Sequence, residues 1–396
     1  MGVTRPDRAV RNTLGSVGLM RALEGLAGAL VVLVVLRDVF QSVVTPRPVS
    51  GRWRLSRFVP LGLWRPWRWA ALQLPSVRAR EGMLGSFGPL AVLLALGTWV
   101  ALLVVGYGLL MDAMRDQVRP RPPGFGSSLY FAATSMLTIG FGDFVPTAAA
   151  TRLVAVVAGA TGLGVFAVVI TFLFSLFAAF QRREVSVVTL EAAASAPPSG
   201  VTLLETHALA HLLGDLPRVF ERWQIWAAEV LDSHLAYPVL AYFRSSHDND
   251  SWISSLGAVM DAATLALTTI DVQATPGASD ALYGWAKLAR AVGGHCIEDL
   301  VLFFDLDGDH YVGVELEEYR QARERLQRAG YVLKPEADGW EAFQRLRSEY
   351  AGRVNALARH WASPPAQWIG DRSPLRVRSQ HDGHVAPSPV SGVKGS

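Results

Sequence analysis

One stretch of the sequence alternates two glycines with large apolar residues and ends on an acid: Thr138, Ile139, Gly140, Phe141, Gly142 and Asp143. Glycine adopts a positive φ without steric cost, so Gly140 and Gly142 allow successive backbone carbonyls to point the same way. A ring of such carbonyls replaces the water that an ion loses in a narrow pore. The stretch therefore favours cation coordination by backbone oxygens, with the Thr138 hydroxyl adding a lower ring. Ile139 and Phe141 would point away from the axis and pack behind it.

Three apolar runs surround this stretch and indicate a membrane protein. The chain of 396 residues is 51% hydrophobic and only 18% charged, which is unusual for a soluble protein. Residues 82–111 and 153–180 carry no charge, and each is long enough to cross a bilayer core of about 30 Å. Residues 25–44 predict a third span, in which Arg37 and Asp38 lie near one end and reach the interface by snorkelling. An interfacial segment is the alternative for this run.

The distribution of arginines predicts which loops face the cytoplasm. Residues 45–81 contain eight arginines, and Arg182 and Arg183 close the third run, so the positive-inside rule places both regions inside. The amino terminus would then lie outside, although the four arginines within residues 5–21 oppose that orientation. The side of the amino terminus is therefore left open.

The connector of residues 45–81 also contains four tryptophans. Arginine beside tryptophan is typical of a helix that lies in the plane of the lipid headgroups. A voltage sensor is disfavoured, because Pro60 and Pro66 are expected to break the helix and no three-residue arginine repeat is sustained.

The glycine-containing stretch lies in the loop between the second and third runs. The preceding residues 127–137, SSLYFAATSML, predict a short helix with Ser127 or Ser128 as its N-cap. A non-helical segment at membrane depth must be buried in protein or line an aqueous path, and a pore satisfies both conditions. The carboxyl end of the short helix carries a partial negative charge, which favours a cation. A turn in an outer loop is the alternative interpretation of the two glycines.

At these residues the chain resembles the prokaryotic potassium channels of the tetrameric pore-loop family, whose signature is Thr-x-Gly-(Tyr/Phe)-Gly-Asp. Tyr130 and Phe131 stand where the pore helix of that family carries an aromatic cuff, and the resemblance runs from about residue 87 to residue 181. It implies two pore helices and one pore loop per subunit, a homotetramer and K⁺ as the permeant ion, without a cofactor. Two departures concern the filter: Phe141 lacks the hydroxyl of the commoner tyrosine, and Leu137 replaces a frequent threonine.

The same resemblance assigns roles along the third apolar run. It places the gating hinge at Gly162, whereas Gly159 serves either pliability or close packing against the outer helix. One stripe of residues at helical spacing, with two polar neighbours, would line the cavity or gate: Phe166, Ile170, Phe174 and Ala178, beside Thr171 and Ser175. Phe174 is the expected hydrophobic constriction, which gates by dewetting.

Beyond Arg183 the composition becomes that of a helical domain. Apolar residues recur at helical spacing in three places: Val219, Trp223, Trp226 and Val230; Trp252, Leu256, Val259, Met260 and Ala263; Trp340, Phe343, Tyr350 and Val354. We therefore expect an all-α membrane protein in five segments: an amino-terminal span and connector at 1–81, a pore domain at 82–183, a linker at 184–201, a cytoplasmic helical domain at 202–370, and a disordered tail at 371–396.

One acidic segment of that domain has part of a calcium-loop pattern. Asp305, Asp307 and Asp309 stand at the first three ligand spacings of a calcium loop. His310 occupies the glycine position, however, and Leu316 occupies the position of the bidentate glutamate. An acidic connection between two helices, with an aspartate capping the second, is therefore the preferred interpretation, and calcium binding is the alternative.

A second metal hypothesis concerns histidines. His207 and His211 stand one helical turn apart, with Asp215 a turn further on. A histidine pair of this kind without a third strong ligand is usually a solvated or packed helix face.

The sequence thus predicts a multi-pass potassium channel of the cell membrane that conducts K⁺ passively, with its carboxyl-terminal domain in the cytoplasm. Its partners would be copies of itself and the lipid bilayer, not nucleic acid, and the ligand of the cytoplasmic domain is unknown. No grouping of nucleophile, base and orienting residue suggests an enzyme. The alternative is a non-selective or weakly conducting cation channel whose cytoplasmic domain acts as a calcium-sensing or interaction module.

Overall fold

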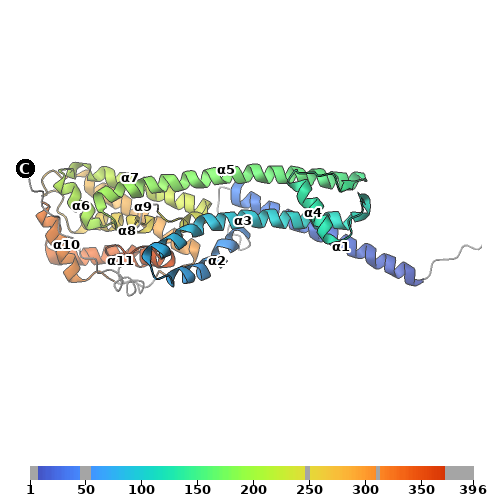
Figure 1. Ribbon diagram of the computed structural model, residues 1–396. Coiled ribbons are helices and arrows are strands. Elements are labelled where there is room, and N and C mark those ends of the chain that lie inside the picture. Colours follow the sequence, from blue (N-terminus) through green and yellow to red (C-terminus); the bar gives the residue numbers. More distant parts are fainter. Residues whose placement is uncertain (1–7, 45–54, 246–249, 309–312, 371–396) are drawn as a thin grey trace, which may run out of the picture. The chain divides into compact units, whose positions relative to one another are not determined.

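The protein is described from a computed structural model, which covers residues 8–44, 55–245, 250–308 and 313–370; for residues 8–15, 43–44 and 55–61 only the backbone is described. The fold is all-α, with a helical carboxyl-terminal region (Figure 1). The chain divides into two compact units. The first comprises residues 1–65 and 87–178, and the second comprises residues 66–86 and 179–396.

Within the described residues, three helices are long and apolar enough to cross a membrane, which confirms the expected membrane protein. They are α1 (Arg8–Val39), α3 (Val77–Ala113) and α5 (Ala149–Ala194). A π-helical turn, η1 (Phe40–Val44), extends α1. The first candidate span therefore covers residues 16–42, so the expected run at 25–44 is long enough to span.

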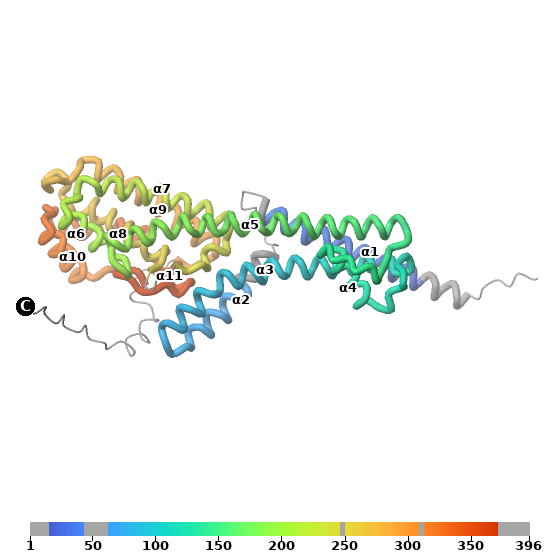
Figure 2. The backbone as a smooth tube through the Cα atoms, turned by 45° about the horizontal axis from the view of Figure 1, so that its top comes forward, coloured from blue at the N-terminus to red at the C-terminus, as the bar shows by residue number. Residues whose placement is uncertain are grey.

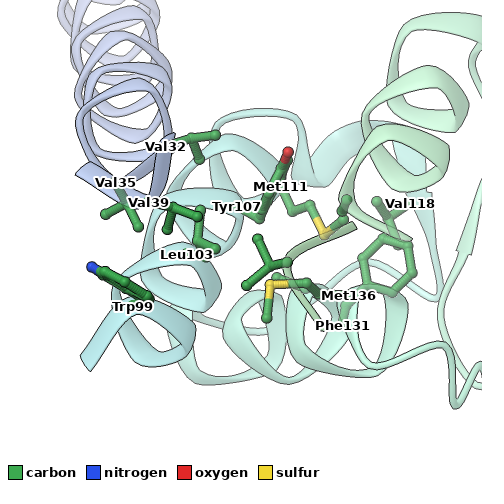
Figure 3. Close-up of a cluster of buried hydrophobic side chains, with 13 residues drawn as sticks. Val32, Val35, Val39, Trp99, Leu103, Tyr107, Met111, Val118, Phe131 and Met136 are labelled. Atoms are coloured by element: carbon green, nitrogen blue, oxygen red, sulfur yellow. The ribbon is translucent and has the colours of Figure 1, made fainter. Parts of the chain in front are cut away.

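Two glycines bring α1 and α3 into backbone contact in the first unit. A Cβ on Gly28 would lie 2.6 Å from the carbonyl oxygen of Gly106, and a Cβ on Gly106 would lie 2.8 Å from a methyl group of Val32. In a lipid bilayer no hydrophobic effect drives helices together. Small residues at the interface favour their association, because they allow the two backbones to approach closely. Figure 3 shows the adjoining cluster, in which Val32, Val35 and Val39 of α1 face α3.

The acid in the first span does not snorkel as expected. The Asp38 side chain is only 5% exposed, and its carboxylate accepts a hydrogen bond of 2.7 Å from the Trp99 indole N–H of α3. Arg37, which is exposed, points elsewhere. The expectation was wrong for Asp38. The free-energy cost of burying a carboxylate falls when a neighbouring helix supplies a hydrogen-bond donor.

The loop between α3 and α5 carries a short helix and a two-stranded ribbon. After the 3₁₀ turn η2 (Arg115–Gln117), β1 (Val118–Arg119) pairs antiparallel with β2 (Val145–Pro146), and α4 (Phe125–Met136) lies between them. Buried side chains of α4 join the cluster of Figure 3, in which Phe131 and Met136 lie near α3 residues such as Leu103. The cluster fixes α4 against α3.

The expected N-cap of this short helix was wrong. The helix begins at Phe125 after Gly124, which offers no side-chain cap, so Ser127 and Ser128 lie inside its first turn. The Ser128 hydroxyl instead donates a 2.8 Å hydrogen bond to the Asp112 carboxylate of α3, and both residues are buried. A tertiary partner therefore outweighs local capping here.

Helix α2 (Leu55–Leu72) runs through positions 60 and 66 without a break, contrary to the expectation for its prolines. Within the second unit, the Trp67 indole N–H donates a 2.8 Å hydrogen bond to the Met83 carbonyl at the start of α3. Within the first unit, Trp64 is buried against Phe87 at a ring-centroid distance of 4.9 Å. These tryptophans thus pack against protein, whereas Trp69 is exposed.

The carboxyl-terminal helices form a bundle in the second unit, which both Figure 1 and Figure 2 show. Its helices and 3₁₀ turns are α6 (Gly200–Leu209), η3 (Leu213–Asp215), α7 (Leu216–Ala236), η4 (Pro238–Tyr242), α8 (Trp252–Thr268), α9 (Ala281–Phe304), α10 (Leu316–Arg328) and α11 (Glu336–His360). Helix α8 is buried on almost every side and packs against α6, α9 and α11. The three expected apolar faces lie on α7, α8 and α11, and their residues are buried or half-buried.

A buried ion pair ties the central helix α8 to α11. Arg347 and Asp261 are each 1% exposed, and the Arg347 Nε donates a 2.9 Å hydrogen bond to the Asp261 carboxylate. The Tyr350 hydroxyl donates a second bond of 2.6 Å to the same oxygen. Burial, followed by the charge of Asp261, raises the Tyr350 pKa well above its ordinary value, so the phenol stays protonated as this bond requires.

The expected linker is mostly helical. Helix α5 continues to Ala194, so only residues 195–199 connect it to α6. Residues 184–194 contain no proline or glycine and include a run of alanines, which favours the continuation. The helix stops where Ser195 adopts a positive φ just before two prolines.

We predict that Gly28→Leu weakens the contact between α1 and α3. The added side chain meets the backbone of Gly106 and Leu110, which cannot rotate away, so the helices must separate at a cost of about 1–3 kcal/mol. Thermal unfolding of the purified protein in detergent should show a lower midpoint. Gly97→Leu on α3 is the matched control, because a Cβ at Gly97 meets nothing within 4 Å. Equal midpoints for both variants would contradict the contact.

Candidate functional site

The backbone of the TIGFGD stretch alternates between positive and negative φ. Gly140 has φ of 57° and Gly142 has φ of 81°, as expected from the sequence, and Thr138 has φ of 57°. Ile139 and Phe141, between them, are absent from the residues with positive φ. A positive φ costs conformational free energy at a β-branched residue such as threonine, and no sequence pattern predicted it here. The alternation therefore begins one residue pair earlier than the glycines indicate.

Two carbonyls at the end of α4 hold the start of this stretch, and the Ser135 carbonyl accepts the Thr138 N–H at 3.2 Å. The Thr134 carbonyl oxygen accepts the backbone N–H of Ile139 at 2.9 Å and that of Gly140 at 3.3 Å. The Thr134 hydroxyl donates to the Phe131 carbonyl at 3.1 Å, within α4. Thr134 is buried, so the carboxyl end of α4 and the filter stretch form one hydrogen-bonded piece.

An aromatic group supports the outer half of the stretch. The ring of Phe141 stacks parallel to that of Tyr130 at a centroid distance of 6.5 Å, and Phe144 meets Tyr130 edge-on at 6.2 Å. Although Phe141 has no hydroxyl, its ring thus still contacts Tyr130, which the sequence placed at the cuff position.

Two expected packing residues lie uncovered in the single chain. Ile139 is 50% exposed and Phe141 is 69% exposed, so the expectation that both pack behind the filter is not met within one chain. Leu137 is exposed as well. Large apolar side chains that a single chain leaves exposed in this way need cover from lipid or from another protein surface.

The expected cavity stripe follows one face of α5. Phe166 and Ile170 are exposed, and Phe174 is 74% exposed. The Thr171 hydroxyl donates to the Ala167 carbonyl at 3.0 Å, while Ser175 and Ala178 are half-buried. These residues lie on one helix at the expected spacing, and the single chain leaves that face uncovered.

The glycines of α5 pack against the end of α4. A Cβ on Gly162 would lie 1.8 Å from the Met136 carbonyl oxygen, and one on Gly159 would lie 3.4 Å from the Ser135 carbonyl oxygen. Gly159 therefore packs against α4, whereas the sequence left open either pliability or close packing against the outer helix. Helix α5 is unbroken at Gly162. The Tyr107 and Thr161 hydroxyls, 2.7 Å apart, join α3 to α5 at the same level.

The ends of α3 and α5 beside the loop are also tied together. The Gln117 backbone carbonyl accepts the Thr147 N–H at 2.9 Å, and the Gln117 side chain accepts the Thr151 hydroxyl at 2.6 Å. Asp116 forms ion pairs with Arg21 of α1 and with Arg121. The hydrogen bond from Arg21 lowers the Asp116 pKa, which keeps this carboxylate charged.

In the second unit, Arg183 anchors the end section of α5 to the helical bundle. Its side chain is only 2% exposed, and its guanidinium donates to the Leu240 carbonyl at 3.0 Å and to the Phe243 carbonyl at 2.8 Å. The same group pairs with Glu184 at 3.0 Å and lies 5.6 Å from the centre of the Trp252 ring. A guanidinium with this many partners fixes the rotation of α5 against the bundle.

Buried His234 of α7 is a further partner of Arg183. Its Nε2 lies 3.3 Å from the guanidinium, and its Nδ1–H donates to the Val230 carbonyl at 2.8 Å. Burial, followed by the charge of Arg183, lowers the His234 pKa to about 3. The imidazole is therefore neutral near pH 7, and its Nε2 accepts a hydrogen bond from Arg183. The sequence indicated Arg183 only as a topology signal and did not indicate His234.

Neither sequence-based metal hypothesis gains support. Asp309 lies outside the described residues, and so does His310; Asp305 ends α9 with φ of 54°. The cap of the following helix is Glu315, in a capping box with Glu318, and not an aspartate as expected. Among the residues that the structure describes, no group of three or more His, Cys, Asp or Glu side chains has a metal-binding arrangement.

The histidine pair does not share a helix face. Helix α6 ends at Leu209, and His211 beyond it has φ of 58°, so the assumed helical spacing to His207 was wrong. His207 is buried and donates from Nδ1 to the Leu203 carbonyl at 2.8 Å. Asp215 lies further on, in the turn η3, where it pairs with Arg218.

Comparison with known proteins decides the class of this site. A family model described as "Ion channel" matches residues 94–179, which include most of α3, the whole of α4, the filter stretch and the first part of α5. Residues 94–179 form an ion-channel domain of the pore-loop type. The matching family consists of channels and not of enzymes. No curated protein and no solved structure matches the chain.

We predict that Gly162→Ala destabilises the channel domain. The new methyl group would overlap the Met136 carbonyl, so α4 and the attached filter must shift, at a cost of about 1–3 kcal/mol or more. The thermal unfolding midpoint of the detergent-solubilised protein should fall. Gly164→Ala, two residues away in α5 and with nothing within 4 Å of its Cβ, should leave it unchanged. A stable Gly162→Ala variant would refute the close contact.

We predict that Arg183→Met strongly destabilises the second unit. The change leaves Glu184 and two backbone carbonyls buried without the guanidinium, and breaking a buried pair in this way costs about 3–5 kcal/mol. Urea unfolding of the purified chain, followed by tryptophan fluorescence, measures the loss. The neighbouring Arg182→Met serves as control, because Arg182 is exposed. A similar loss in both variants would mean that charge alone matters at this position.

Proposed function

We propose that the chain is a potassium-selective channel that conducts K⁺ passively across the cell membrane, with Thr138–Asp143 as its selectivity filter. The observation that carries the proposal is the alternation of φ at Thr138, Gly140 and Gly142. This alternation turns successive carbonyls to the same side, and a column of carbonyls is what a dehydrated K⁺ requires. The proposal needs no cofactor, because K⁺ is the transported ion.

The proposed assembly is a homotetramer in the lipid bilayer. One chain contributes one filter segment, and a single row of carbonyls cannot surround an ion. The exposed faces of the single chain agree with such an assembly, because Ile139 and Phe141 beside the filter and Phe174 on α5 all lack cover. In a closed ring, the neighbouring subunit covers the filter side chains and the four stripes face a common axis.

The gate is proposed on α5. Phe166, Ile170, Phe174 and Ala178, with Thr171 and Ser175, line the cavity, and the Phe174 rings form the narrowest apolar ring. Gly162 is the proposed hinge, and its close contact with Met136 supports a pivot of α5 against the end of α4 at this point.

The proposed topology follows the arginine distribution. The connector before α3 and the whole bundle from α6 to α11 lie in the cytoplasm, with the bundle as a regulatory domain. Arg183 supports this role, because it joins the end of the pore-lining helix to α7 and η4 of the bundle through one buried side chain. No nucleic-acid partner is proposed.

Ion flux from liposomes tests this function. The full-length protein, reconstituted in liposomes, should release K⁺ about ten-fold or more faster than Na⁺, which corresponds to ~1.4 kcal/mol of discrimination. Gly142→Ala should abolish the K⁺ flux, because alanine is strained at φ of 81° and its carbonyl turns away. Gly97→Ala, at an ordinary φ and without close contacts, should conduct like the unchanged protein.

The same assay separates the alternative function. Equal K⁺ and Na⁺ fluxes would contradict selectivity and favour a weakly selective cation channel. A flux that changes when Ca²⁺ is added to the cytoplasmic side, and that loses this response in Asp305→Asn, would favour a calcium-sensing domain. Absence of flux for both cations would overturn the proposed function.

A further inference from the structure

A cavity of about 360 Å³ lies beside the end section of α5, within the second unit. Its walls come from that section of α5, from α6 and from α7. This volume lies in the range of small-molecule sites, which begins at about 300 Å³. The cavity is unrelated to the filter, and no sequence motif pointed to it.

The polar groups of the cavity favour a negative charge. Arg222 of α7 lines the cavity, and among the described residues it forms no ion pair. No carboxylate is among the residues that line the cavity. Ser186 and Thr189 of α5 also line the cavity, and the Thr189 hydroxyl donates to the Val185 carbonyl within that helix. An unpaired guanidinium is a typical binding group for a carboxylate or phosphate.

The remaining lining favours an apolar body on the ligand. Trp223 is largely buried and packs against Trp226 at a centroid distance of 4.4 Å, and Leu203 of α6 is fully buried. The His207 imidazole on the same wall donates from Nδ1 to the Leu203 carbonyl, so its Nε2 is the nitrogen left for a ligand. Aromatic and aliphatic walls with a few polar groups are typical of sites for small organic ligands.

We propose that this cavity binds a small organic anion, in which a phosphate or carboxylate group is attached to an apolar body. Arg222 binds the anionic group, and Trp223 packs against the apolar body. A soluble phosphate ester and the headgroup of an anionic lipid both have this chemistry, and the experiment below distinguishes them.

Occupancy of the cavity would act on the pore through α5. Thr189 lies fifteen residues after Phe174 in the same unbroken helix, and the cavity is lined by residues of that helix, of α6 and of α7. A ligand that fits one position of α5 better than another shifts the population towards that position. This regulatory part rests on the proposed channel function, whereas the binding part does not.

Calorimetry on the full chain tests binding. The protein is placed in nanodiscs of phosphatidylcholine and titrated with phenyl phosphate, and benzyl alcohol serves as the neutral probe. We expect saturable heat with phenyl phosphate only, and an affinity about ten-fold or more weaker in Arg222→Gln. Arg218→Gln is the matched control, because Arg218 lies one turn earlier on α7, pairs with Asp215 and does not line the cavity. Ala193→Leu should also prevent binding, because it fills the cavity.

The calorimetry decides whether the cavity binds an anion. Absence of saturable heat with phenyl phosphate, or equal affinity in Arg222→Gln and the unchanged protein, would overturn the proposal. Loss of phenyl phosphate binding in nanodiscs that contain phosphatidylglycerol would identify the lipid headgroup as the occupant, whereas retained binding would identify a soluble ligand. The K⁺ flux from liposomes should change with phenyl phosphate in the unchanged protein and not in Arg222→Gln; binding without any flux would contradict the channel function but leave the site supported.

Discussion

A backbone that leaves the helix inside a membrane must satisfy its own polar groups, and the channel domain depends on how it meets this constraint. The turn from α4 into the Thr138–Asp143 stretch meets it with two carbonyls, since Ser135 accepts one amide and Thr134 accepts the next two. The φ alternation that starts at Thr138 then frees the carbonyls on one side for another use. Because α4 is held by Asp112 and by the close approach of Gly162, packing against α3 and α5 sets the position of the Thr138–Asp143 stretch.

The second constraint is the attachment of the end of α5 to the carboxyl-terminal bundle. The helix does not stop where its apolar run stops; it continues for more than a dozen residues and carries Arg183 into the bundle. A flexible linker at this point would leave the end of α5 free to move against the bundle. A continuous helix with a buried guanidinium does the opposite, because rotation or translation of α5 must displace Arg183 from its carbonyl partners or move those partners with it.

The sequence predicted the apolar helices, the filter glycines and the bundle faces well, because periodicity and composition determine these features. The sequence-based predictions were wrong where a residue distant in the sequence supplies the hydrogen-bond partner. Ser128 could cap its helix locally but instead bonds to Asp112, and Asp38 could snorkel but instead accepts from Trp99. His211 shows a different error, since the assumed helix ends two residues earlier. The positive φ of Thr138 and the role of His234 could not have been found at all without the tertiary contacts.

The crossing of α1 and α3 at Gly28 and Gly106 has a consequence for the periphery of the channel domain. A Cβ on either glycine would meet atoms of the other helix, so α1 covers the backbone of α3 at this crossing. Removal of the amino-terminal helix would therefore uncover a strip of α3 main chain. A fragment limited to the matched residues 94–179 would therefore lack α1, the helix that covers this backbone.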